Sequence, residues 1–170
     1  KWSRQYQGKV SNQNVAITSG CNQAFCASIS SFTGENDEVI IPTPWYFNHH
    51  MWLQMAGVKS IPLDTDANMY PIIEKAEALI TDRTRAIVLV SPNNPSGAIY
   101  SNQLLQKFFD LCKSNQIRLI IDETYKDFHP NASQPHTLLE NNNWDQVLTI
   151  LYSFSKTYRM TGHRVGALLT

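Results

Sequence analysis

One segment decides the fold of this chain: Arg85-Ala86-Ile87-Val88-Leu89-Val90-Ser91. Its unbroken apolar run is typical of a strand that is covered on both faces of a sheet. The turn Pro92-Asn93-Asn94-Pro95-Ser96-Gly97 follows, and Ser101 is then expected to cap a helix that ends near Ser114. A buried strand followed by an amphipathic helix is the repeating unit of an α/β sheet.

The same alternation runs through the rest of the chain. Hydrophobic periodicity predicts further strands at Val15–Thr18, Glu38–Ile41, Val58–Leu63, Ile117–Ile121, Gln146–Tyr152 and Val165–Leu169. It predicts further helices at Gly20–Phe32, Tyr46–Ala56 and Tyr70–Ile80. The pattern therefore predicts an α/β fold of three layers, with helices on both faces of a mostly parallel seven-stranded sheet. In such sheets ligands bind beyond the carboxyl ends of the strands.

Composition narrows the function classes. The 170 residues include 14 Lys+Arg and 14 Asp+Glu, so the formal net charge is zero. A broad surface for nucleic acid would need an excess of basic residues, although one small anion pocket remains compatible. The apolar runs are too short to span a bilayer, and no secretory signal opens the sequence. Cys21, Cys26 and Cys112 are expected to be reduced thiols in a cytoplasmic protein.

Small and polar residues stand where two of the strands are predicted to end. After Thr18 the chain runs through Gly20, Cys21 and Asn22 into a helix, whose free amides can hold a phosphate. The alternative is an ordinary capped helix start. Asn94 follows the Arg85–Ser91 strand in a turn that is also typical of a plain loop. Taken singly, neither motif predicts a site.

Charged residues follow two other strands. Asp122 comes directly after a buried strand, so its charge needs a partner such as a cationic ring nitrogen, unless it caps a helix. Lys156 lies just past the next strand, where desolvation would favour a neutral, nucleophilic amine; a solvated surface lysine is the alternative. Ser153, Ser155 and Arg164 can bind a phosphate. Because all these residues lie at one edge of the sheet, together they indicate a site.

At these residues the sequence resembles the large, cofactor-binding domain of the class I/II aminotransferases, the fold-type I enzymes that use pyridoxal 5′-phosphate. The most specific match is Ser153-Phe154-Ser155-Lys156, followed by Arg164 and Val165-Gly166. Asn94-Pro95-Ser96-Gly97 and Asp122-Glu123-Thr124-Tyr125 also occur in the family's order and spacing. The resemblance runs from about Val15 to the last residue.

The resemblance implies a role for each matching residue. Lys156 is similar to the lysine that forms a Schiff base with the cofactor aldehyde and later moves a proton, and Asp122 to the partner of the ring nitrogen. Tyr125 and Asn94 resemble the residues that hydrogen-bond the phenolic oxygen of the ring. Tyr46 matches the aromatic residue that stacks on the ring, although a shift of one residue would exchange it with Trp45. The phosphate is implied to lie on Gly20, Cys21, Asn22, Ser153, Ser155 and Arg164. Cys21 is expected to offer only its backbone amide, because a thiol is a poor donor.

The resemblance also implies an activity and its partners. It predicts transfer of an amino group between an amino acid and a 2-oxo acid by a homodimer, without a metal and without nucleic-acid or membrane partners. It implies that residues 1–170 are part of a longer protein, whose N-terminal arm and C-terminal small domain lie outside them. The small domain would supply the arginine for the substrate carboxylate. A lyase or decarboxylase on the same scaffold, and a ligand-sensing domain of a transcription regulator, remain as alternatives.

Two other motifs carry less weight. Ser153-Phe154-Ser155-Lys156 also fits the S-x-x-K motif of serine hydrolases, but the S-D-N and K-T-G partners of that motif do not occur. His49 and His50 fall in a predicted helix, and no further metal ligands stand at suitable spacing.

Overall fold

The computed structural model describes residues 2–170, and its centre is a seven-stranded sheet with the strand order β1-β7-β6-β5-β4-β2-β3. The strands are β1 (Val15–Thr18), β2 (Glu38–Pro42), β3 (Lys59–Leu63), β4 (Thr84–Val90), β5 (Arg118–Asp122), β6 (Leu148–Ser153) and β7 (Gly166–Leu169). The pairs β2–β3, β2–β4, β4–β5 and β5–β6 are parallel, whereas β7 runs antiparallel to both β6 and β1. The predicted α/β fold with a mostly parallel sheet is confirmed.

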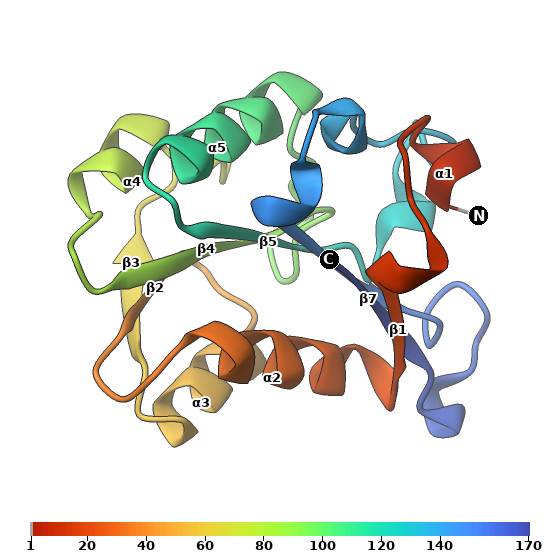
Figure 1. Ribbon diagram of the computed structural model, residues 1–170, viewed down its shortest axis with the longest axis horizontal. Helices are drawn as coiled ribbons and strands as arrows, with labels where there is room; N and C mark the ends of the chain where they lie inside the picture. Colours follow the sequence, from red (N-terminus) through yellow and green to blue (C-terminus); the bar gives the residue numbers. More distant parts are fainter. Residues whose placement is uncertain (1) are drawn as a thin grey trace.

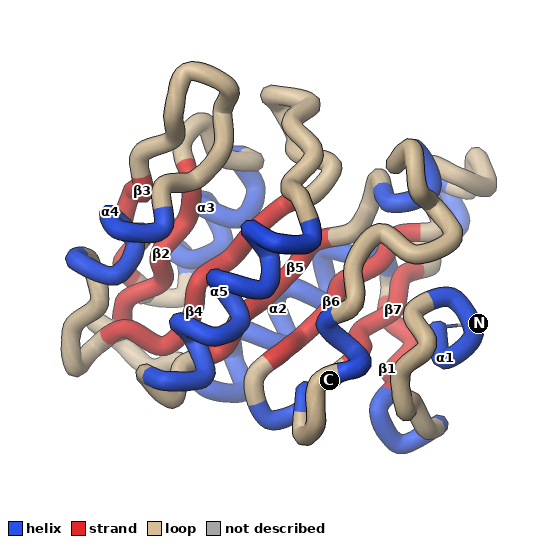
Figure 2. Tube along the Cα trace, turned by 90° about the horizontal axis from the view of Figure 1, so that it is seen from above, coloured by secondary structure: helices blue, strands red, loops and turns tan. Residues whose placement is uncertain are grey.

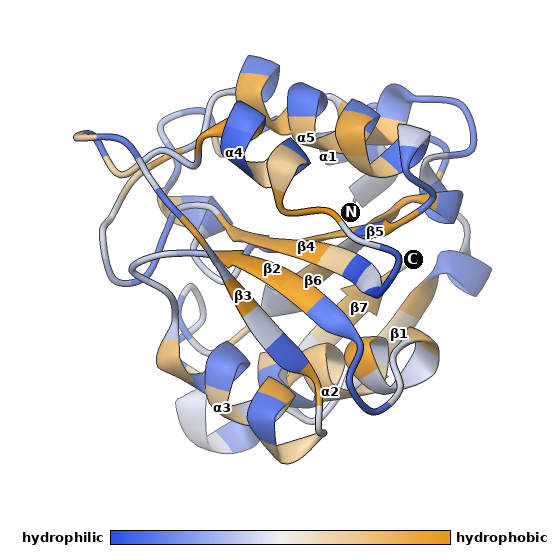
Figure 3. Ribbon diagram, turned by 90° about the vertical axis from the view of Figure 1, so that its left-hand side faces the viewer, coloured by the Kyte–Doolittle hydropathy of each residue, from blue (hydrophilic) through white to orange (hydrophobic). Residues whose placement is uncertain are grey.

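Helices cover both faces of this sheet, as the expected three-layer architecture requires (Figure 1). One face carries α2 (Gly20–Phe32) and α3 (Phe47–Met55), and the other carries α4 (Ile73–Ala78) and α5 (Asn102–Ser114). The short α1 (Trp2–Gln5) lies near β1 and β7 (Figure 2). The strands form the apolar middle layer (Figure 3).

The hydrophobic core is divided between the two faces. Ile87, Leu89 and Ile121 point towards α5, and Val88 and Ile120 point towards α2. β4 is buried from Ala86 to Val90 on both faces, which is the reason for its unbroken apolar sequence. Ser101 caps α5 as predicted, because its side chain accepts a hydrogen bond from the amide of Leu104.

Two segments differ from the sequence-based prediction. The helix expected over Tyr70–Ile80 is shortened to Ile73–Ala78, because Pro71 pairs with Thr65 in an isolated bridge and the amide of Tyr70 is held by Asp66. The stretch between β5 and β6, for which no element was expected, holds three short 3-10 helices: η2 (Lys126–Phe128), η3 (Leu138–Glu140) and η4 (Trp144–Gln146). Within residues 2–170, no helix is long and apolar enough to cross a membrane.

The topology brings distant parts of the chain to one edge. β4, β5 and β6 are parallel, so their carboxyl ends at Val90, Asp122 and Ser153 lie together. β7 runs the other way and therefore begins at the same edge, where Gly166 is in register with both Thr18 and Ser153.

Candidate active site

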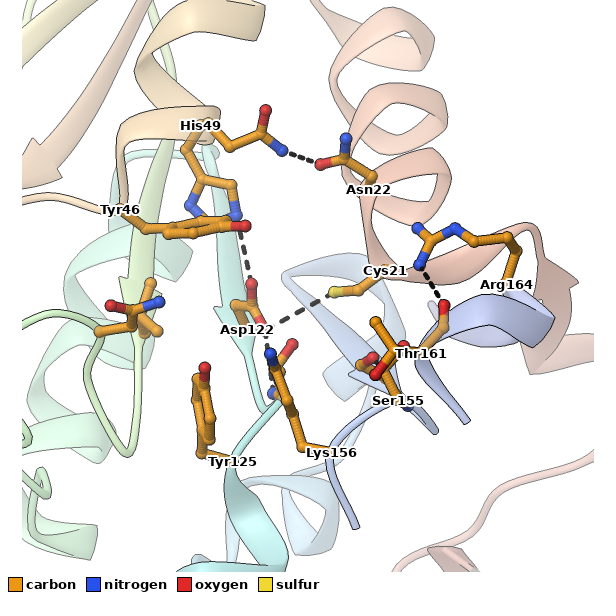
Figure 4. Close-up of a pocket in the computed structure, with 15 residues that line it drawn as sticks. Cys21, Asn22, Tyr46, His49, Asp122, Tyr125, Ser155, Lys156, Thr161 and Arg164 are labelled. Carbon is orange, nitrogen blue, oxygen red and sulfur yellow. Dashed lines mark hydrogen bonds and ion pairs between the residues drawn. The ribbon is translucent and has the colours of Figure 1, made fainter. Parts of the chain in front are cut away.

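A pocket of about 410 Å³ occupies the carboxyl edge of the sheet. That volume is typical of small-molecule and cofactor sites. Its walls come from the ends of β4, β5 and β6, the starts of α2 and α3, and the segment before β7 (Figure 4). Every site residue predicted from the sequence lines the pocket except Gly20, which lies against the guanidinium of Arg164. The lining also includes Asn48, His49, Val90, Thr124 and Thr161.

Asp122 is the buried carboxylate of the pocket. Its side chain is hydrogen-bonded by three neighbours: Oδ2 lies 3.2 Å from Nε2 of His49, and Oδ1 accepts from the amide of Thr124 at 2.9 Å and from the thiol of Cys21 at 3.6 Å. Burial alone would raise the pKa of Asp122, but the hydrogen bond and charge of His49 and the hydrogen bonds of Thr124 hold it below its ordinary value. The pocket therefore contains an ionised carboxylate.

His49 belongs to the site, and the sequence reasoning considered it only as a metal ligand. It is 3% exposed, stacks on Phe25 at 4.2 Å between ring centroids and meets Tyr46 edge-on at 5.1 Å. The sequence did contain a signal that His49 faces the pocket. His49 stands three residues after Tyr46, which was already assigned to the pocket, and residues three apart at a helix start share a face. His50 points elsewhere, to Ser60. Among residues 2–170, no group of three or more His, Cys, Asp or Glu side chains could hold a metal ion.

The side chain of Cys21 differs from its expected role. The sequence suggested that only its backbone amide would matter, yet Sγ faces the pocket and donates to Asp122. Burial, and next the charge of Asp122, raise the pKa of this thiol well above its usual value, so it stays protonated and can donate. α2 packs over β6 and β7, and its first turn brings Cys21 to Asp122 at the end of the neighbouring strand β5.

The start of α2 forms an anion cradle. Ser19 is the N-cap residue, but its side chain makes no capping hydrogen bond, so the ordinary capped start considered above does not occur. Gly20 has φ +78, and a Cβ there would overlap the guanidinium of Arg164; a Cβ on Gly166 would overlap the backbone of Gly20. Glycine at both positions therefore lets Arg164 and the first amides of α2 approach the same point.

Two serines complete this side of the pocket. Ser153 ends β6 and Ser155 follows it, both are buried, and the Ser153 hydroxyl accepts from the amide of Ser155 at 3.2 Å. Arg164 has a left-handed backbone and donates from Nη1 to the carbonyl of Thr161 at 3.1 Å, so its guanidinium is held at the cradle. Asn48, in the first turn of α3, donates to the side chain of Asn22, which ties the starts of α3 and α2 together.

Lys156 lines the same pocket as the buried carboxylate, and Figure 4 shows its side chain between Tyr125 and Ser155. It sits in the turn after β6, and its Nζ lies 5.8 Å from the ring centroid of Tyr125. The sequence predicted a desolvated lysine, but Lys156 is exposed, because it stands three residues beyond the end of the strand at the open side of the pocket. Asn94 and Tyr125 line the pocket beside it.

The structure also decides between two neighbouring aromatic residues. Tyr46 lines the pocket, whereas Trp45 stacks on His50 at 4.4 Å and does not. Burial, and next the charge of Asp122, raise the pKa of Tyr46. Tyr46, which the resemblance implies as the stacking residue, therefore lines the pocket, and Trp45 does not.

Fold and site together define a class: an α/β domain in which a glycine-flanked helix start, a buried carboxylate, a lysine and an arginine gather at one edge of the sheet. Comparison with known proteins agrees, because the family "Aminotransferase class I and II" matches residues 1–170. The chain belongs to this aminotransferase family.

The relatives show how much of a family member the chain represents. It is 33% identical over 166 residues to the aromatic aminotransferase ISS1 of Arabidopsis thaliana, covering 94% of this chain and 41% of that protein. It is 29% identical over 167 residues to an aspartate aminotransferase of Thermotoga maritima, covering 97% and 44%. The structure of an aromatic aminotransferase from Pyrococcus horikoshii superposes with a TM-score of 0.90 at 26% identity, covering 99% of this chain and 46% of that one. The chain thus spans less than half the length of these relatives.

Proposed function

We propose that this chain is the cofactor-binding large domain of a pyridoxal-phosphate-dependent aminotransferase, which moves an amino group between an amino acid and a 2-oxo acid. The observation that carries the proposal is the combination, in one pocket, of the ionised Asp122, the amine of Lys156 and the anion cradle at α2. Family membership supports the same reading.

The residues of the pocket fit pyridoxal 5′-phosphate. A phosphate dianion needs several donors, and the cradle offers the amides of Cys21 and Asn22, the hydroxyls of Ser153 and Ser155, and the guanidinium of Arg164. The cradle stays open because Gly20 and Gly166 lack a Cβ that would fill it. When bound, this cofactor supplies an aldehyde and an electron-withdrawing ring for chemistry at the α-carbon of an amino acid.

Each remaining residue has a role that follows from its chemistry. The Nζ of Lys156 would be the nucleophilic amine that holds the cofactor, and it would serve as the base for the substrate proton. Asp122 would favour a positive charge on the ring nitrogen, because its own ionised state is supported by His49 and Thr124. Tyr125 and Asn94 would offer hydrogen bonds to the phenolic oxygen of the ring, and Tyr46 would offer an aromatic surface to the ring.

The proposal includes an assembly and a compartment. A homodimer is supported by the exposed apolar face of α3, on which Phe47, Met51 and Met55 recur at helical spacing beside the pocket. Sedimentation of the native protein tests it. Cys21, Cys26 and Cys112 are free thiols, which supports a reducing compartment such as the cytoplasm.

The function is tested on the native protein with a panel of amino donors and 2-oxo acid acceptors. Matched formation of a new amino acid and a new 2-oxo acid supports the proposal. Loss of carbon dioxide or of a side-chain group without amino transfer would favour a lyase or decarboxylase. Cofactor binding without turnover over the whole panel would favour a ligand-sensing domain.

A further inference from the structure

The turn that carries Lys156 is held mainly to itself and to the segment before β7. The amide of Phe154 donates to the carbonyl of Val165 at 3.1 Å, the amide of Tyr158 donates to Phe154 at 3.2 Å, and the amide of Met160 donates to Ser155 at 3.1 Å. None of these three backbone bonds reaches the segment after β5, which carries Tyr125. A side-chain contact between the two segments would add to the placement of the lysine relative to Tyr125.

One carboxylate oxygen of Asp127 makes such a contact. Oδ2 of Asp127 accepts a hydrogen bond from the hydroxyl of Thr157 at 3.0 Å and from the hydroxyl of Tyr152 at 2.5 Å. Thr157 follows Lys156 directly, and Tyr152 directly precedes Ser153. Asp127 lies in η2, two residues after Tyr125. One oxygen atom thus joins both ends of the lysine segment to the segment of Tyr125.

The segment that carries Asp127 is held by backbone hydrogen bonds to β6 and within itself. The amide of Glu123 donates to the carbonyl of Leu151 at 2.8 Å, the amide of Lys126 donates to Glu123 at 3.0 Å, and the amide of Phe128 donates to Tyr125 at 2.9 Å. The hydroxyl of Tyr152 is a dependable donor, because burial, and next the hydrogen bond to Asp127, raise its pKa. The distance of 2.5 Å between the two oxygens is at the short end for an O–H···O hydrogen bond.

We propose that Asp127 is a positioning residue for Lys156, which fixes the lysine-bearing turn through Thr157. The inference rests on the proposed role of Lys156. Asp127, Thr157 and Tyr152 do not line the pocket, so the proposed effect on the reaction is indirect, through the placement of the lysine. Misplacement of a reacting group lowers the rate of a step more than it lowers the affinity for the ligand.

The test uses Thr157→Val, which keeps the shape of the side chain without its hydroxyl, and Thr157→Ser, which keeps the hydroxyl. The native protein is incubated with saturating pyridoxal phosphate, and the rate of borohydride-trapped labelling at Lys156 is followed by peptide mapping. Loss of one hydrogen bond predicts labelling about three- to tenfold slower in Thr157→Val, with cofactor affinity and melting temperature little changed. Thr157→Ser is expected to label at the wild-type rate.

A mutant cycle with Asp127→Ala completes the design. The double variant Asp127→Ala/Thr157→Val is expected to label no more slowly than Asp127→Ala alone, because both changes remove the same contact. Asp110→Ala, at an exposed position of α5, is the control.

If Asp127→Ala does not fold, the two Thr157 variants still decide the question. Wild-type labelling in Thr157→Val, or a defect that Thr157→Ser shares, would overturn the inference. Labelling of the wild-type protein at a residue other than Lys156 would overturn the proposed function instead.

Discussion

Nε2 of His49 lies 3.2 Å from Oδ2 of Asp122, between the first turn of α3 and the end of β5. Both side chains are buried, and the imidazole is held between Phe25 and Tyr46. The carboxylate therefore has a fixed partner in the protein itself, which keeps it ionised inside a low-dielectric pocket.

Removing this partner should destabilise the protein. His49→Phe keeps an aromatic ring against Phe25 but leaves the carboxylate of Asp122 buried with one partner fewer, so we expect the free energy of unfolding to fall by about 3 kcal/mol. Urea unfolding measures it. His50→Phe is the matched control, because His50 contacts Trp45 and Ser60 outside the pocket. Equal midpoints for His49→Phe and the wild type would contradict the pairing.

Gly162 and Gly166, the two glycines on either side of Arg164 in the sequence, should respond differently when a methyl group is added. In Gly166→Ala the new Cβ overlaps the backbone of Gly20 and the amide of Cys21, so we expect a loss of about 1–3 kcal/mol in stability together with weaker cofactor binding. In Gly162→Ala no atom lies within 4 Å of the new Cβ, and stability should change by less than about 0.5 kcal/mol. Thermal melts and cofactor titrations test both. A tolerated Gly166→Ala would mean that β7 and α2 do not meet as described.

Arg164 should matter for the cofactor phosphate, and its neighbour Arg159 should not. Arg164→Ala removes a charged donor from the cradle, which predicts at least about tenfold weaker binding of pyridoxal phosphate. Arg159→Ala is the control, because Arg159 is exposed and does not line the pocket. Fluorescence titration measures both dissociation constants. Similar losses in the two variants would show a general charge effect rather than a specific contact.

Acid should destabilise the protein through Asp122 and Glu123. Burial alone would raise the pKa of Glu123, but the hydrogen bond and charge of His136, the charge of Lys126 and the hydroxyl of Tyr6 lower it, and the pKa of Asp122 is lowered too. Groups with lowered folded pKa values contribute stability that is present above their unfolded pKa values, near 4, and is lost as pH falls through the folded values.

The melting temperature should therefore decrease once the pH is lowered below about 4. The decrease should be smaller in Glu123→Gln, because a glutamine side chain cannot take up the proton that Glu123 binds. Scanning calorimetry from about pH 2.5 to about pH 7, a range that brackets the pKa of roughly 4 of a free carboxyl group, measures how the melting temperature changes with pH. Glu35→Gln at an exposed position is the control. Parallel slopes for Glu123→Gln and the wild type would show that Glu123 is not held ionised by its neighbours.

The sequence predicted those elements whose signal is local. β4 could be recognised from its apolar run, and α5 from Ser101 and the spacing of its apolar residues, because burial on both faces or on one stripe determines these patterns. The shorter α4 could not be foreseen, because the bridge between Pro71 and Thr65 depends on how a loop folds back. The 3-10 helices after β5 have no periodic pattern.

The sequence predicted those site residues that stand at or directly after the end of a strand. Asp122, Ser153 and Asn94 could be placed there because parallel strands bring their carboxyl ends together. The contact of Asp122 with Cys21 depends on how α2 packs on the sheet, and no spacing in the sequence reveals it. For the contact with His49, the sequence offered only the spacing of His49 from Tyr46. The exposure of Lys156 likewise depends on the shape of the turn after β6.

The central claim is that Lys156 is the residue that binds the cofactor, and reductive labelling tests it most directly. The native protein is mixed with pyridoxal phosphate, reduced with borohydride, digested and mapped by mass spectrometry. The account predicts one phosphopyridoxyl label on Lys156, its loss in Lys156→Arg, and no change in Lys113→Arg at an exposed site on α5. A label on another lysine, or an unchanged label in Lys156→Arg, would contradict it.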